Sequence, residues 1–317
     1  MTRFLTLRAL QALAVLVVVS VAVFGLLHAL PGTPARAILG PRATAVAVAA
    51  FNRQNGFDLP LPLQYLHYLL RCLHGDLGFS YRRNEPVSRL LAATVPRTLL
   101  LVGSSTLLAA AVAVPVGLAQ AVRRNRAADN ALTAITLTLY SMPVFWLGLL
   151  LVDVFAVRLN RLPPEAPSGG PWQMLAHPAG LVLPVATLSL VTLASFSRYV
   201  RSSTVEQLEQ EYVRTALSKG LRPGQVVRRH VLRNALSPVI SLLGLSLPWV
   251  LSGSLVVEAV FNVPGTGFLF WTAAQGHDYP VMLGVVLVVA AGTVLGSLLA
   301  DLAYAALDPR LRDQGGA

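Results

Sequence analysis

TLLLVGSSTLLAAAVAVPVGLAQA, residues 98–121, contains no charged side chain and a single proline, Pro115. A helix needs about 20 predominantly apolar residues to cross the hydrocarbon core of a bilayer, and this stretch is long enough. Pro115 is tolerable there because neighbouring helices can satisfy the backbone groups that it frees. The stretch therefore predicts a membrane-spanning helix.

The composition of the whole chain also indicates lipid as its solvent. Apolar residues other than glycine make up 55% of the chain and charged residues 12%, whereas soluble domains average about 25% charged residues. We therefore predict an all-α polytopic membrane protein with six transmembrane helices, at about residues 9–30, 97–122, 131–157, 180–200, 236–260 and 281–306.

These segments divide the chain into four predicted parts. They are an N-terminal transmembrane helix (1–30), an extracytoplasmic cap loop (31–96), a core transmembrane domain (97–306) with an inner loop at 201–235, and a cytoplasmic tail (307–317). Arg3 and Arg8 before an apolar run, with Ala35-Arg36-Ala37 after it, imitate a cleavable signal peptide. Because the run is long and five further spans follow, we expect it to be retained as an anchor.

Six spans place both termini on the same side of the membrane, and the basic residues indicate which side. With the N-terminus inside, the inner segments hold the greater share of the 25 Lys and Arg residues, as the positive-inside rule requires. Most of the others lie between Arg36 and Arg97, in a loop long enough to be translocated regardless of its charge. We therefore expect both termini in the cytoplasm.

The predicted cap loop has signs of local structure. Residues 58–62, DLPLP, are typical of a turn, and Gln64 to Leu73 has the pattern of a short amphipathic helix that stops at Gly75. Such a cap either docks another molecule or merely seals the outer ends of the helices.

The inner loop at 201–235 is unlike a loose connector. The spacing of its apolar residues predicts a helix from Thr204 to Lys219, ended by Gly220. Pro223 suits the first turn of a second short helix, whose pattern continues until Pro238. We expect two short helices joined by a glycine hinge, which form a rigid knob beneath the membrane helices.

The sequence of this loop resembles a known family. EYVRTALSKGL (211–221) followed by HVLRNALSP (230–238) is similar to the cytoplasmic signature loop of ABC importer permeases, in the branch that carries dipeptides, oligopeptides and nickel. GDLGFS (75–80), PRTL (96–99), EAVF (258–261), PGTG (264–267), DYP (278–280) and the tail at 301–310 match the branch in the same order. Leu217-Ser218 and Asp153 depart from its pattern.

The resemblance implies a type I (MetI-like) ABC importer permease fold in a bacterial inner membrane, with cytoplasmic coupling helices. The loop would dock in a cleft of an ATPase subunit, with Tyr212 as an anchor and with Arg214 and Lys219 paired to acidic groups. The implied ATPase-coupling set is Glu211, Tyr212, Arg214, Thr215, Ala216, Lys219, Gly220 and Leu221. The implied partners are a second homologous permease, two ATPase subunits, an extracytoplasmic solute-binding protein and membrane lipid.

Several other functions do not fit the sequence. No Gly-x-x-x-x-Gly-Lys-Ser/Thr run is present, so we expect no catalytic residue and no cofactor on this chain, with ATP and Mg²⁺ bound by partner subunits. Although the net charge is +11, the basic residues are dispersed without an aromatic platform, which argues against nucleic acid. An intramembrane enzyme would need a His-Glu-x-x-His or paired-aspartate site within its spans, and neither is present. A stand-alone secondary transporter would favour internal repeats, and the sequence shows no convincing repeat.

Charged residues within membrane segments are candidates for function because they are costly there. Asp153 and Glu258 are candidates for the translocation path, where they would contact a peptide amino group or a cation; the alternative is an interfacial carboxylate that reaches water. We expect no metal site, since the spacing of His67, Cys72 and His74 is not a tetrahedral zinc pattern. Peptides are the first choice of substrate, and nickel or a metal chelate is the alternative.

Overall fold

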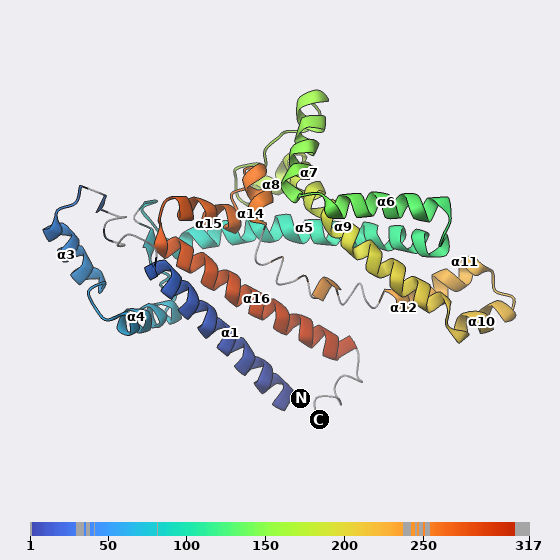
Figure 1. The fold of residues 1–317 in the computed structure, drawn as a ribbon, viewed down its shortest axis with the longest axis horizontal. Helices are drawn as coiled ribbons and strands as arrows, with labels where there is room; N and C mark the ends of the chain where they lie inside the picture. The colour runs from blue at the N-terminus through green and yellow to red at the C-terminus, as the bar shows by residue number, and fades with distance from the viewer. Residues whose placement is uncertain are drawn as a thin grey trace.

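A computed structural model of the chain describes residues 2–29, 42–80, 82–236 and 254–307, together with residues 35, 39, 40, 242–244, 246 and 250. Within these residues the secondary structure is helical except for one pair of short strands. Two long helices, α5 (Val87–Val122) and α9 (Ala179–Leu208), pack along each other at the centre of the molecule (Figure 1). The other elements are arranged around this pair.

Small residues allow α5 and α9 to approach closely. Ala113 is fully buried between the two helices, beside Phe196 and Val200 of α9. At Gly117 an added Cβ atom would lie 2.6 Å from the Cβ atom of Val200 and 2.7 Å from the backbone oxygen of Ser197. In lipid, such close backbone contact replaces the hydrophobic driving force that water supplies to soluble helices.

A second helix pair lies beside this centre. Helix α1 (Thr2–Ala29) packs against α16 (Tyr279–Leu307), and the start of α1 lies near the end of α16 (Figure 1). Their other ends lie close to the part of the predicted cap loop from Ala45 to Pro86, called the outer segment below. There Phe24 of α1 packs with Tyr68, Tyr279 and Leu283.

Three described helices are long and apolar enough to cross a membrane, namely α5, α9 and the Tyr279–Leu299 part of α16. They overlap the second, fourth and sixth predicted spans. The described apolar part of α1, Leu13–Gly25, is shorter. About half of the fifth predicted span, 236–260, lies outside the described residues. The total of six spans therefore stays a prediction.

The third predicted span is not one continuous helix. It consists of α6 (Ala127–Ser141), α7 (Val144–Leu151) and the π-helical η1 (Val152–Arg158), with a bend of 106° between α6 and the rest. Met142 at the bend is extended, with φ −71° and ψ 133°. Pro143 causes this conformation because a residue that precedes proline is driven out of the helical region. The prediction of one uninterrupted helix over 131–157 was therefore wrong.

The outer segment contains α3 (Ala45–Asn55), α4 (Leu61–Leu73) and a hairpin of β1 (Phe79–Ser80) and β2 (Glu85–Pro86). In the hairpin Phe79 pairs with Pro86 and Ser80 with Glu85, in antiparallel register. The predicted helix from Gln64 to Leu73 is confirmed. The predicted start of the next helix at residue 97 was wrong, because α5 begins at Val87 and continues through Pro96.

The hairpin is fastened to α15 (Thr266–Gln275) and to the turn that follows it. The Ser80 hydroxyl donates to a carboxylate oxygen of Asp278, Arg82 donates to the backbone oxygen of Gly276 at 3.1 Å, and Arg83 donates to the Thr272 hydroxyl at 2.7 Å. The start of α5 is therefore held against the segment that leads into α16.

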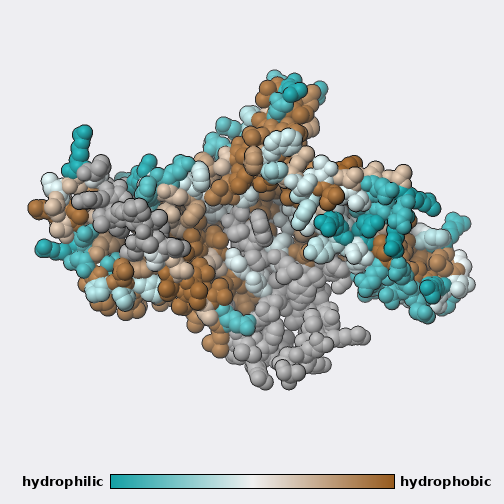
Figure 2. Space-filling model, in the orientation of Figure 1, coloured by the Kyte–Doolittle hydropathy of each residue, from teal (hydrophilic) through white to brown (hydrophobic). Residues whose placement is uncertain are grey.

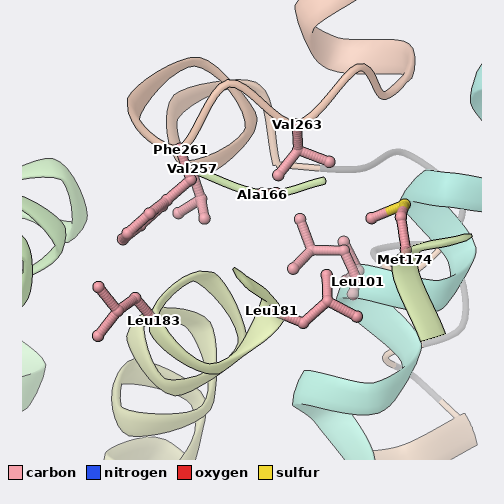
Figure 3. Close-up of a cluster of buried hydrophobic side chains, with 9 residues drawn as sticks. Leu101, Ala166, Met174, Leu181, Leu183, Val257, Phe261 and Val263 are labelled. Carbon is pink, nitrogen blue, oxygen red and sulfur yellow. The ribbon is translucent and has the colours of Figure 1, made fainter. Parts of the chain in front are cut away.

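A buried apolar cluster joins α5 and α9 to α8 (Pro171–Ala176) and α14 (Leu255–Val260) (Figure 3). Phe261 and Val263 extend into it from the chain that follows α14, and Met174 extends into it from α8. The Ala166 amide donates to the Phe261 backbone oxygen at 2.9 Å, so the loop between η1 and α8 is also joined to the end of α14 through the backbone.

We predict that Gly117→Ala weakens the contact between α5 and α9. Overpacking of this kind costs about 1–3 kcal/mol, measured as the thermal or denaturant unfolding of the detergent-solubilised protein. Gly103→Ala in the same helix is the matched control, because its added Cβ atom would lie 3.8 Å from Val250, an ordinary contact. The control is expected to be neutral or to gain up to about 1 kcal/mol of helix propensity; equal effects at both positions would contradict the close approach.

Candidate functional site

The knob predicted between the fourth and fifth spans exists, with different helix bounds. Helix α9 continues to Leu208, and the chain then breaks before α10 (Glu211–Ser218). After a turn follow α11 (Pro223–Val226), the π-helical η2 (Val227–Val231) and α12 (Leu232–Ala235). The single helix predicted from Thr204 to Lys219 was therefore wrong, because its first part belongs to α9.

The break at Gln210 lets the knob build its own small core. Gln210 is extended, with φ −72° and ψ 150°, and the Tyr212 hydroxyl donates to the Gln207 side chain across the break at 2.9 Å. Helix α10 thereby turns its apolar side toward α11 and η2. The buried core of the knob consists of Val213, Ala216, Val226 and Val231.

The predicted coupling residues differ in their exposure to solvent. Glu211, Arg214, Thr215, Lys219 and Gly220 are exposed, and Tyr212 and Leu221 are half-buried. Ala216 is 8% exposed and faces the knob's own core. Ala216 therefore packs inside the knob, and its part in coupling stays a prediction. Val213 was not expected in the core, because the single helix predicted from Thr204 to Lys219 has no break at Gln210 to change its register.

The turn after α10 depends on Gly220. Its φ of +84° lies in the left-handed region, which residues with a Cβ atom rarely adopt. An added Cβ atom would meet nothing within 4 Å, so the requirement comes from backbone conformation and not from space. The predicted helix end at this glycine is confirmed.

The knob presents charge at one end of the molecule. Hydrophilic side chains gather over α10 and α11 at the right of the space-filling view (Figure 2). Besides Arg214 and Lys219, the exposed basic residues of the knob are Arg222, Arg228, Arg229 and Arg233. This end of the central helices is therefore suited to bind an acidic surface.

The two candidate path carboxylates lie in different environments. Asp153 lies in η1 and pairs with Arg158 at 2.8 Å, and the side chains of the two residues are 48% and 73% exposed. Glu258 lies in α14 and is completely buried. The structure does not bring them together, and a role for either in the path stays a prediction.

Glu258 ties α14 to α5 and α15. Its Oε1 atom accepts a hydrogen bond from the Thr98 hydroxyl at 2.7 Å, and its Oε2 atom accepts one from the Phe268 amide at 2.9 Å. Thr98 in turn accepts a bond from the Thr266 amide at 2.8 Å. At Gly267 an added Cβ atom would lie 2.6 Å from the Cα atom of Leu255, so this tie also needs glycine in the PGTG motif.

The residues considered as metal ligands form no metal site. Among the described residues, no group of three or more His, Cys, Asp or Glu side chains could hold a metal ion. Partial burial raises the pKa of the Cys72 thiol, and the His74 ring lies 2.7 Å from the Leu70 backbone oxygen. Both are accounted for by local packing.

We predict that Thr98→Val destabilises the protein by about 1–3 kcal/mol, because it leaves a buried carboxylate oxygen and the Thr266 amide without a partner. The matched control is Thr106→Val in the same helix, since the Thr106 hydroxyl only donates to the Val102 backbone oxygen one turn earlier. Thermal unfolding of the two variants checks this prediction. A loss at position 106 as large as that at 98 would argue against the tie.

A family comparison agrees with this arrangement. Residues 113–313 match the family model described as binding-protein-dependent transport system inner membrane component, and residues 1–102 match the model of its N-terminal part. The chain is similar in fold to a chain of the inward-facing MetNI methionine ABC transporter, with a TM-score of 0.56 and 20% identity over 69% of this chain and 96% of the other.

Curated relatives are similar over their whole length. A protein of Brucella ovis named as a peptide permease is 40% identical over 324 residues, which cover 98% of this chain and 99% of the relative. A glutathione transport system permease protein of Salmonella choleraesuis is 38% identical over 312 residues, with the same coverage. The chain therefore belongs to the family of binding-protein-dependent transport system inner membrane components, and it is a multi-pass permease subunit of an ABC importer rather than an enzyme.

Proposed function

We propose that this chain is one half of the membrane pathway of an importer for short peptides. The observation that carries the proposal is the exposed, charged knob at the end of the central helix pair, opposite the outer hairpin (Figure 1). Two relatives of full length are named for peptide and glutathione transport, which supports peptides as the substrate class. Nickel gains no support from a metal-ligand cluster among the described residues.

The knob is the element that couples the pathway to ATP hydrolysis. A buried apolar core stiffens the knob, and its exposed charged residues are available to a partner. Helix α9 leads into it with a break of only two residues. Motion imposed on the knob is therefore carried into the membrane helices as a rigid-body shift.

The partners follow from this design. Two ATPase subunits supply the acidic clefts that receive the knobs, and a second homologous permease completes the pathway by a pseudo-two-fold arrangement. A solute-binding protein docks on the hairpin and α4 at the other end. Both termini face the cytoplasm, since the start of α1 and the end of α16 point away from that outer segment (Figure 1).

We predict that Gly220→Val uncouples the knob while leaving membrane insertion intact. A β-branched residue at this positive φ costs about 1–2 kcal/mol, enough to weaken docking of the ATPase subunits by about tenfold. Co-purification of the ATPase subunits and substrate-stimulated ATP hydrolysis measure the effect. Gly224→Ala is the matched control, because it lies in α11 without a positive φ and with open space around it. Full coupling in Gly220→Val would count against the proposal.

The proposed orientation is tested by labelling single cysteines in a Cys72→Ala background. Ser218→Cys on the knob is expected to react with a membrane-impermeant maleimide only in inside-out vesicles. Leu73→Cys, at a side chain that is 82% exposed at the end of α4, is expected to react only from the outside. The opposite pattern would reverse the orientation, and labelling of both from one side would refute the topology.

A further inference from the structure

A buried ion pair joins α6 to α9 close to the knob. Asp129 in the first turn of α6 accepts two bonds from Arg201 of α9, from Nε at 3.0 Å and from Nη2 at 2.8 Å. The Asp129 side chain is only 2% exposed and that of Arg201 32%. Two parallel bonds between a guanidinium and a carboxylate fix both distance and orientation.

The same carboxylate is held from its own side of the contact. The backbone amide of Asn125 donates to Oδ2 of Asp129 at 3.0 Å, and the Thr133 hydroxyl donates to Oδ1 at 3.3 Å. The buried Gln120 of α5 donates to Thr133 at 3.2 Å. Helices α5, α6 and α9 therefore meet in one polar network, and Asp129 also lies favourably near the positive end of the α6 dipole.

A second ion pair links nearly the same segments in a different environment. Arg124 donates to Glu209 at 2.9 Å, and their side chains are 51% and 68% exposed. Exposed pairs of this kind contribute about 0–1 kcal/mol, whereas loss of one partner from a buried pair leaves a charge uncompensated. The buried pair is therefore the one able to transmit force.

We propose that the Asp129–Arg201 pair is a positioning element that makes α6 move together with the knob. Arg201 lies two turns before α9 ends at the knob, and α6 leads through the bend at Pro143 into α7. A displacement of the knob thus reaches α9 through the backbone. It also reaches α6, through the bonds between Arg201 and Asp129. This inference rests on the proposed coupling role of the knob.

The test compares Asp129→Asn, Arg201→Lys and the control Arg124→Ala in the assembled transporter with its ATPase subunits. Spin labels at Leu137→Cys of α6 and Ser218→Cys of α10, in a Cys72→Ala background, report the distance between α6 and the knob. It is measured without nucleotide and with ATP trapped by vanadate. Uptake per ATP hydrolysed is measured in parallel in proteoliposomes with glutathione as the probe. Arg201→Lys keeps the charge and serves if Asp129→Asn fails to fold.

The proposal expects one narrow distance in the native pair and in Arg124→Ala, unchanged by nucleotide. In the two pair variants the distance broadens or shifts with nucleotide, and uptake per ATP falls by about tenfold or more, as expected for the loss of a charged hydrogen bond. An unchanged narrow distance in both variants would overturn the proposal, as would relative movement in the native pair. If the ATPase subunits do not bind the knob at all, the proposed function fails separately, because co-purification detects it.

Discussion

The close packing of α5 against α9 is the contact on which the other contacts depend. Alanine and glycine on α5 let the two backbones come so close that a larger side chain would not fit between them. This close packing is the main source of helix association in lipid. The outer hairpin, the apolar cluster of Figure 3 and the first residues of α6 all attach to this pair. A change in the spacing of α5 and α9 would therefore move the elements attached to them.

Buried polar ties fix the two ends of this pair. Toward the outer segment, Glu258 joins α14 to Thr98 of α5 and to the start of α15. Toward the knob, Asp129 joins α6 to Arg201 of α9. Each tie is satisfied by several donors, as the low dielectric of a protein interior requires. Apolar packing alone would let the helices slide or rotate, whereas these directional bonds specify one register.

The arrangement suits a subunit that transmits work done elsewhere. The chain has no Gly-x-x-x-x-Gly-Lys-Ser/Thr run, and in the proposed function movement enters through contact with a partner. Four buried apolar residues form the core of the knob and stiffen it, while its charged side chains lie outside. In the proposed coupling role, the knob, the short break and the long helix α9 act together as a lever.

The sequence by itself determined the class of the protein, the apolar helices, the end of α10 at Gly220 and the family, because apolar length, glycine in a left-handed turn and ordered motifs are local properties. Only the tertiary structure decided the rest. The bend at Pro143 was missed because its flanks are both apolar, and the break at Gln210 because helical periodicity continues across it. The pairing of Asp129 with Arg201 depends on how α6 lies against α9, and no local pattern encodes a contact between residues so far apart in the chain.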